Sequence, residues 1–229
     1  MIITVDGSDG VGKTTLAKKL AEHLSFEYVK DPLDEIVRIN GNSENKLRAA
    51  QNARNRIFRN NLSDSQIANF LLKTLILLKK KASTQNLIVD RGMLSAAIYN
   101  LNDETEGLFD YLLQRGSEMD ISILLTSSKE ERIRRLKIKA QNNNDPYNDV
   151  ENQRVLNLDT TRTEQFAISR NLNCIIIDTN NKTEEQVFDE VISRLQQNTI
   201  FNQYRSRTNI SHITQQDSPN SAHEGRSES

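Results

Sequence analysis

The sequence predicts an α/β fold of three layers, in which helices cover both faces of a five-stranded parallel sheet. Short apolar runs alternate along the chain with longer segments of helical pattern, and this alternation is typical of strand-helix-strand units in a parallel sheet. A glycine-rich loop also joins the first apolar run to the first helical segment. We expect one domain over residues 1–201 and a disordered polar tail over residues 202–229, because apolar side chains are almost absent from the tail.

The first strand-loop-helix segment carries a phosphate-binding motif. Residues 2–5 are apolar and β-branched, as in a buried parallel strand, and a helix is predicted over residues 13–24. The loop between them has two glycines with four residues between them, followed by Lys and Thr. The backbone N–H groups of such a loop and the start of the next helix attract a polyphosphate. The predicted donor-nucleotide site consists of Gly7, Ser8, Gly10, Val11, Gly12, Lys13, Thr14 and Thr15.

Charged side chains are expected to complete this site. Lys13 can reach the outer phosphates of a nucleoside triphosphate, and the Thr14 hydroxyl can ligate Mg²⁺. The strand predicted at residues 86–91 ends in Asp90 and Arg91, and ligands bind outside the carboxyl ends of strands in an open parallel sheet. We therefore expect Asp90 to hold Mg²⁺ directly or through water, and Arg91 to hold a phosphate. A salt bridge at the strand end is the alternative for this pair.

The segments between these strands are more ambiguous. A short strand at residues 26–30 ends at Asp31 and Pro32, and residues 44–60 are polar and rich in arginine. Residues 63–82 have the clearest helical pattern, and apolar side chains lie almost all round that helix. Such a helix is buried on more than one side, in the core or against a partner. A homodimer formed through it is our hypothesis.

The second half of the chain repeats the alternation. We predict strands at residues 121–125 and 174–177, and helices at 95–101, 104–114, 150–171 and 183–197. A basic helix begins near residue 128 and ends at the polar turn of residues 141–146. A basic helix joined to a polar loop is what a lid that closes over phosphates requires. An ordinary exposed helix and loop is the alternative.

Composition narrows the range of partners. A formal net charge of -1 gives no global basic surface for nucleic acid or for an anionic membrane. The single cysteine, Cys174, cannot form an internal disulfide, which suits a reducing cytoplasm. No apolar stretch is long enough for a membrane span, and a strand at the first residues leaves no room for a signal peptide. We expect a cytoplasmic protein with nucleotide substrates.

The motifs favour a small kinase over other nucleotide-binding proteins. A phosphate-binding loop alone permits a kinase, a GTPase switch, a motor ATPase or a passive binder. The nearest match to the guanine-specific Asn-Lys-x-Asp signature lies at residues 181–184 and has Glu in the last place. Two sets of phosphate-binding groups, one around Lys13 and one around Arg91, suit a reaction that aligns two substrates.

The sequence resembles the thymidylate kinase family, within the nucleoside monophosphate kinases, over residues 1 to about 197. Residues 7–15 are similar to the phosphate loop of that family, and residues 90–99 are similar to its Asp-Arg-Tyr segment. The resemblance implies transfer of the γ-phosphate of Mg-ATP to dTMP. A deoxynucleoside kinase of similar fold is the first alternative, and a nucleotide-binding regulatory module with little transfer activity is the second.

The resemblance also implies roles for individual residues. Asp9 would bind the sugar 3′-hydroxyl, Arg91 the acceptor phosphate, and Phe70 would stack on the base. Ser95 and Tyr99 would line the pocket for base and sugar. The implied acceptor site is thus Asp9, Phe70, Lys73, Arg91, Ser95 and Tyr99.

The sequence departs from the family pattern at several positions. Gly10 stands where some members carry a catalytic arginine, so Arg134 or Arg135 of the lid would have to supply that charge. Thr74, with Lys73 beside it, stands where an arginine is expected, and Gly92 replaces an aromatic residue. The catalytic groups implied are therefore Lys13, Arg91, Arg134 and Arg135.

Overall fold

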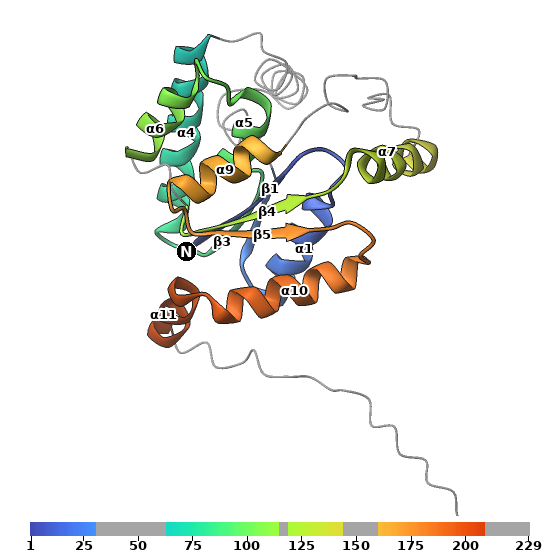
Figure 1. The fold of residues 1–229 in the computed structure, drawn as a ribbon. Helices are drawn as coiled ribbons and strands as arrows, with labels where there is room; N and C mark the ends of the chain where they lie inside the picture. Colours follow the sequence, from blue (N-terminus) through green and yellow to red (C-terminus); the bar gives the residue numbers. More distant parts are fainter. Residues whose placement is uncertain (31–62, 115–118, 144–159, 209–229) are drawn as a thin grey trace, which may run out of the picture.

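The structure is a computed structural model that describes residues 1–30, 63–114, 119–143 and 160–208. Its centre is a parallel sheet with the strand order β2-β3-β1-β4-β5 (Figure 1). The strands are β1 (Ile2–Gly7), β2 (Glu27–Lys30), β3 (Leu87–Asp90), β4 (Ile121–Thr126) and β5 (Cys174–Asp178). The helices are α1 (Lys13–Leu24), α4 (Asp64–Ala82), α5 (Met93–Asn100), α6 (Glu106–Gln114), α7 (Lys129–Asn143), α9 (Thr161–Ser169), α10 (Glu184–Gln197) and α11 (Thr199–Thr208). The predicted α/β fold with five parallel strands is confirmed.

The register of the central strands brings the motifs of the sequence together. Strand β1 pairs with β3 on one side, where Val5 lies opposite Asp90, and with β4 on the other, where Gly7 lies opposite Leu125. All three strands run in the same direction. The loop after β1 therefore lies at the same edge of the sheet as the end of β3.

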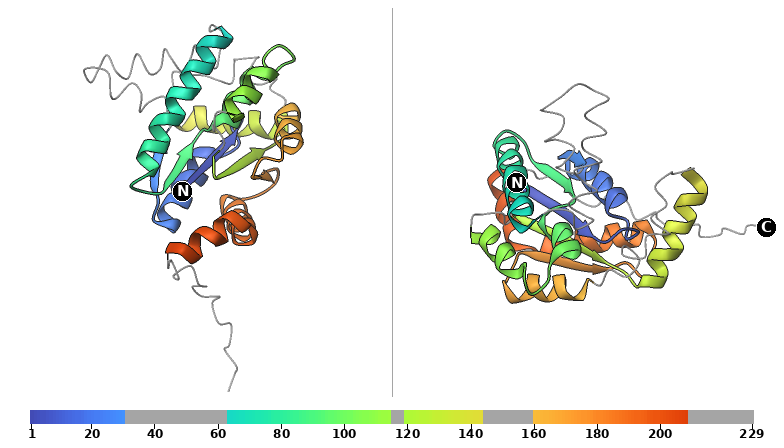
Figure 2. Two further views of the ribbon diagram at one scale, coloured as in Figure 1. Left: turned by 90° about the vertical axis from the view of Figure 1, so that its left-hand side faces the viewer. Right: turned by 90° about the horizontal axis from the view of Figure 1, so that it is seen from above.

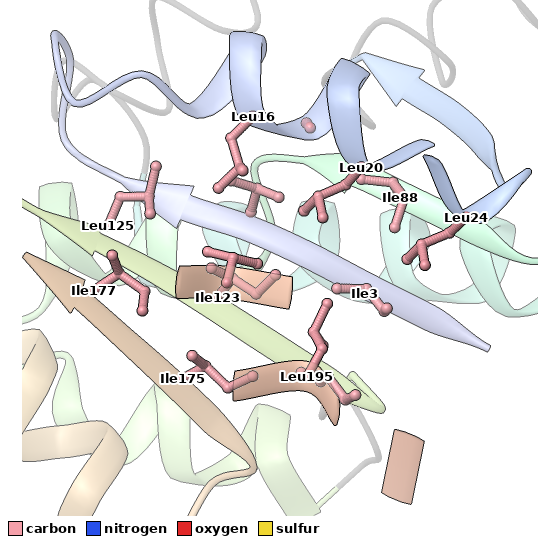
Figure 3. Close-up of a cluster of buried hydrophobic side chains, with 14 of the residues drawn as sticks. Ile3, Leu16, Leu20, Leu24, Ile88, Ile123, Leu125, Ile175, Ile177 and Leu195 are labelled. Atoms are coloured by element: carbon pink, nitrogen blue, oxygen red, sulfur yellow. The ribbon is translucent and has the colours of Figure 1, made fainter. Parts of the chain in front are cut away.

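Helices cover both faces of the sheet (Figures 1 and 2). On one face α1 and α10 pack over Ile3, Val5 and the inward side chains of β4 and β5, and Figure 3 shows this core. On the other face lie α4, α5, α6 and α9. Burial of these apolar side chains fixes the position of the sheet edge that carries the site.

Helix α4 is buried on two sides, as its sequence predicts. Leu75 and Leu78 pack against the side chains of β3, and Leu71 and Leu72 pack against a cluster that includes residues of α5 and α6. Ile76 is 64% exposed. Packing within the chain thus accounts for most of the apolar surface of this helix.

The expected disordered tail was wrong over residues 202–208, which belong to helix α11. Phe201 is buried in the same core as α1 and α10, and the Tyr204 ring stands edge-on to Phe26 with centroids 6.1 Å apart. Phe201 and Tyr204, three residues apart, give this mostly polar helix one apolar face. The average composition of the segment does not show this spacing. Residues 209–229 lie outside the described ranges.

Other predictions are shortened or left untested. The helix predicted over residues 150–171 is described only as α9 (Thr161–Ser169). Residues 31–62, with the Asp-Pro pair and the arginine-rich segment, lie outside the described ranges, as do residues 144–159 of the predicted lid loop. Within the described part of the chain, no helix is both long and apolar enough to cross a membrane.

Candidate active site

The loop after β1 adopts backbone conformations that its glycines allow. Gly12 caps the start of α1 with φ 97°, in the left-handed region that favours glycine. Gly10 has φ 87°, and a Cβ atom there would lie 3.0 Å from the Arg132 carbonyl oxygen and 3.2 Å from Leu136 Cγ. Helix α7 therefore packs directly against the loop at Gly10, where a family arginine would not fit without displacing it.

Lys13 is buried beside the loop. Its exposed fraction is 5%, its Nζ donates a hydrogen bond of 2.6 Å to the Ser8 carbonyl oxygen, and its Nζ lies 3.8 Å from Asp9 Oδ1. Burial, together with the nearby Arg91 guanidinium, lowers the pKa of Lys13 to about 8, although Asp9 and Asp90 partly oppose this shift. An anionic ligand beside this amine would favour its protonated form.

Arg91 and Tyr99 meet on the carboxylate of Asp9. Arg91 Nη2 donates to Asp9 Oδ1 at 2.7 Å, and the Tyr99 hydroxyl donates to Asp9 Oδ2 at 2.7 Å. Burial raises the pKa of Asp9, but the charges of Arg91 and Lys13 outweigh it and hold that pKa well below its usual value. Burial and the Asp9 charge raise the pKa of Tyr99, which keeps its hydroxyl as a donor. Four predicted residues are thus brought together at one point.

Thr14 and Asp90, the two residues predicted to bind Mg²⁺, contact each other. Thr14 Oγ1 donates to Asp90 Oδ2 at 2.6 Å, and the Tyr28 hydroxyl lies 3.2 Å from the same oxygen. The other carboxylate oxygen, Asp90 Oδ1, is buried and has no hydrogen-bond partner in the described ranges. A hydroxyl and a free carboxylate oxygen are suitable ligands for Mg²⁺. Among the described residues, no group of three or more His, Cys, Asp or Glu side chains is arranged to hold a metal ion, so phosphate oxygens and water would have to complete the coordination.

The remaining acceptor residues are only partly placed. Ser95 is fully buried on α5, and its hydroxyl has no hydrogen-bond partner in the part of the chain that the structure describes. Lys73 is exposed on α4. The side chain of Phe70 lies outside the description, although its backbone belongs to α4.

The two arginines predicted to act in a lid, Arg134 and Arg135, bind a residue of their own helix. Arg134, which is 61% exposed, binds Glu131 through two nitrogens at 2.7 Å. Arg135 binds Glu131 at 2.8 Å and the Thr179 carbonyl oxygen at 2.6 Å. These hydrogen bonds outweigh the effect of burial and lower the pKa of Glu131 to about 2. The structure therefore places both guanidinium groups against Glu131 rather than beside Lys13 or Arg91.

Three residues of the site were missed by the sequence analysis. Arg132 is 3% exposed and belongs to the turn of α7 that covers Gly10. Tyr28 reaches Asp90 from the neighbouring strand, and Asp6 binds the start of α5. Of the three, only Asp6 had a signal in the sequence, because it is an acidic residue directly after the apolar run of residues 2–5. The other two depend on tertiary contacts.

Comparison with known proteins gives a consistent picture. The model of the cytidylate kinase-like family matches residues 2–167. A probable thymidylate kinase from Methanococcus vannielii is 24% identical over an alignment that covers 82% of this chain and 92% of the relative. A second, from Methanococcus maripaludis strain C6, is 22% identical over 84% and 94%.

Solved structures agree on the fold. The deoxyadenosine kinase from M. mycoides with bound dATP has a TM-score of 0.53 and 17% identity, over 86% of this chain and 99% of that chain. The same enzyme with bound dCTP has a TM-score of 0.51 and 16% identity. The family model matches most of the chain, and the phosphate loop lies beside Lys13 and Arg91, which both contact Asp9. This protein therefore belongs to the cytidylate kinase-like family and is a nucleotide kinase.

Proposed function

We propose that the enzyme transfers the γ-phosphate of Mg-ATP to a deoxynucleoside monophosphate, with dTMP as the preferred acceptor. The observation that carries this proposal is the meeting of Lys13 and Arg91 at one carboxylate. Lys13 Nζ and Arg91 Nη2 lie 3.8 Å and 2.7 Å from Asp9 Oδ1. A cation that belongs to the donor loop and a cation that follows β3 thus share one small volume, as transfer between two phosphorylated substrates requires.

The chain's own residues would act by holding charge and position. The loop amides and Lys13 would bind the β- and γ-phosphates, and Arg91 would hold the acceptor phosphate in line with the γ-phosphorus. An acceptor phosphate oxygen forms the new P–O bond while the bond from the γ-phosphorus to the bridging oxygen breaks, which yields two diphosphates. Because no strong base is needed for this attack, positioning and charge neutralisation supply most of the catalysis.

Thr14 and Asp90 would hold Mg²⁺, which when bound neutralises charge on the transferred phosphoryl group. The free Asp90 Oδ1 supports this role. Asp9 would release part of its contact with Arg91 to bind the sugar 3′-hydroxyl, and Ser95 and Tyr99 would line the pocket. Phe70 and Lys73 remain proposed acceptor residues on α4.

For the lid, we propose that α7 supplies positive charge to the phosphates. Arg134 and Arg135 would have to leave Glu131 to do so, whereas the backbone of Arg132 already lies against the loop at Gly10. The contact between α7 and Gly10 supports a lid role for this helix.

A deoxynucleoside kinase is the second candidate, and the likeness of the fold to a deoxyadenosine kinase favours it. A nucleoside acceptor must lose its hydroxyl proton, which requires a general base. Asp9 is poorly suited to that task, because Arg91 and Lys13 hold its pKa far below its usual value. Asp31, the carboxylate that directly follows β2, could also supply a base and lies outside the described residues, so the acceptor screen decides between the two candidates.

An acceptor screen tests the proposal. Purified protein, MgATP and each candidate acceptor are combined, and ADP formation is followed with a coupled assay. We expect dTMP to give the highest kcat/KM, above thymidine, deoxyadenosine and deoxycytidine. Faster transfer to a nucleoside would favour the deoxynucleoside kinase, and tight ATP binding without transfer to any acceptor would favour a regulatory module.

We further propose that the enzyme is a cytoplasmic homodimer. The exposed Ile76 on α4 supports an interface at that helix. Light scattering at micromolar concentration tests the state of assembly, and a mass equal to one chain would exclude the dimer.

A further inference from the structure

Asp6 joins strand β1 to the start of helix α5 through a buried carboxylate. Its Oδ1 accepts hydrogen bonds of 2.7 Å from the backbone nitrogens of both Gly92 and Ser95, and its Oδ2 accepts one of 2.6 Å from Thr4 Oγ1. Asp6 and Thr4 are fully buried. A carboxylate at a helix start satisfies N–H groups that have no partner in the helix and interacts favourably with its dipole. Here the cap comes from another element, 86 residues away from Gly92.

This contact clamps the backbone of Arg91. The Arg91 nitrogen donates to the Val5 carbonyl oxygen at 3.0 Å, and the next nitrogen, that of Gly92, donates to Asp6. Consecutive residues of β1 thus hold the N–H groups on both sides of the Arg91 α-carbon. Arg91 has φ 87°, a conformation that a non-glycine residue adopts only where its surroundings impose it.

Gly92 lies close against Thr4 of β1. A Cβ atom at Gly92 would lie 2.7 Å from Thr4 Cγ2, so a larger residue would push the chain away from β1. The Thr4 side chain therefore leaves no room at position 92 for the aromatic residue of the family pattern. Close approach at Gly92 lets its nitrogen reach the carboxylate of Asp6.

The clamp sets the directions of the acceptor-side residues. Held in this way, Arg91 points back to Asp9 in the loop that follows β1, at 2.7 Å. The same helix start presents Ser95, and one turn later Tyr99, whose hydroxyl reaches the other oxygen of Asp9. Within the described residues, the hydrogen bonds of Asp6 go to Thr4, Gly92 and Ser95 and not to the donor side. On the donor side Asp6 acts through its charge alone, which raises the pKa of Lys13 against the effect of burial.

We propose that Asp6 is a positioning residue for the acceptor site, which acts through Arg91 and α5 and not by touching substrate. The proposal rests on the function proposed above. It separates the two substrates: loss of Asp6 should disturb acceptor binding far more than donor binding, because Asp6 acts on the donor site only through its charge on Lys13.

The test measures both substrates in the Asp6→Ala variant. We expect the KM for dTMP to rise at least about tenfold, since a displacement of about 1 Å in a catalytic group is enough for a large loss. The ATP dissociation constant, measured by calorimetry without acceptor and below pH 8 so that Lys13 stays charged, should change far less than the dTMP KM. Asp6→Asn should recover most of the loss, because its amide oxygen still accepts from both backbone nitrogens.

Two comparisons separate positioning from general damage. In an Arg91→Ala background, Asp6→Ala should add less than about twofold to the dTMP KM, because residues that act through one another are not additive. Asn198→Ala is the matched control: Asn198 Oδ1 accepts from the Phe201 nitrogen at 3.1 Å at the start of α11, at the other end of the sheet. Its loss should leave both constants unchanged.

The outcomes are distinguishable. If the wild-type enzyme transfers phosphate but Asp6→Ala leaves the dTMP KM unchanged, or weakens both substrates equally, this inference is overturned. If wild-type enzyme transfers phosphate to no acceptor, the proposed function itself fails. Should Asp6→Ala not fold, Asp6→Ser, which keeps a polar group but is too short to accept from both backbone nitrogens, decides: a raised dTMP KM supports the clamp, and an unchanged one overturns it.

Discussion

At the scale of single residues, the site is dominated by charges that shift one another. Asp9 sits between Lys13 and Arg91 and stays ionised despite its burial, because these two cations hold its pKa low. The same burial acts in the opposite direction on Lys13, whose pKa falls to about 8. The positive charge that a polyphosphate needs is therefore only weakly retained in the free enzyme near pH 8.

This shift predicts that nucleotide binding takes up protons. A bound polyphosphate favours the charged amine and raises its pKa, so near pH 8 binding should take up about half a proton, and the affinity should fall as the pH rises further. Calorimetry in two buffers of different ionisation enthalpy measures this uptake. Lys13→Ala should abolish it while the protein remains folded. Equal uptake in the variant would assign the proton to another group.

The free energy of unfolding depends on pH in the opposite direction to nucleotide affinity. A lysine with a lowered pKa in the folded protein destabilises it while charged, so this contribution to the free energy of unfolding becomes more favourable between about pH 8 and the ordinary lysine pKa of 10.5. Below about pH 8 the protein carries the full cost of burying the charge. Ligand binding and stability thus respond to pH in opposite directions at this one residue.

Individual residues also show where the sequence was sufficient. Lys13, Thr14, Asp90 and Arg91 could be singled out because their motifs are short and have a fixed chemistry, and the structure brings them close together. Asp6, Tyr28 and Arg132 were missed because each reaches the site through a contact between elements far apart in the chain. No local pattern encodes such a contact.

At the scale of elements, the contact between α7 and the loop is the most specific feature. A helix, α7, forms where the sequence predicts one, and its residues Arg134 and Arg135 bind Glu131 of the same helix; its role as a lid stays a proposal. The Arg132 carbonyl oxygen and Leu136 pack at Gly10. The phosphate loop and helix α7 are therefore in contact in this structure.

Gly10→Ala should break this contact. The added Cβ would meet the Arg132 carbonyl oxygen at 3.0 Å, and φ 87° is unfavourable for alanine. We expect a loss of about 1–3 kcal/mol in the free energy of unfolding, measured by chemical denaturation, together with weaker ATP binding. Gly107→Ala on α6 is the control, since a Cβ there meets nothing within 4 Å. Equal stability of the two variants would contradict the packing of α7 on the loop.

Helix α11 shows how a composition argument fails. The segment is mostly polar, but Phe201 is 3% exposed in the main core. Phe201→Ala should cost about 3 kcal/mol by thermal or chemical unfolding. Ile200→Ala, at a residue that is 41% exposed, should cost less than about 1 kcal/mol. Similar losses in both variants would show that α11 does not pack as described.

At the scale of the whole molecule, strand order explains why two distant motifs form one site. The alternation of apolar runs and helices predicted the parallel sheet, because burial on both faces requires continuous apolar strands. The order β2-β3-β1-β4-β5 was not predicted, since it depends on how the helices pack. With β1 between β3 and β4, the phosphate loop and the Asp90–Arg91 pair become neighbours at one edge.

The most direct test of the central claim, that Lys13 and Arg91 serve two phosphorylated substrates, compares wild-type enzyme with Arg91→Ala on dTMP and thymidine. The control is Arg194→Ala, an exposed arginine on α10. We expect wild-type kcat/KM for dTMP to exceed that for thymidine at least about a hundredfold. Arg91→Ala should lower the dTMP value by a similar factor, while Arg194→Ala leaves it unchanged. Preference for thymidine, or an Arg91→Ala variant that phosphorylates dTMP as well as wild type, would contradict the account.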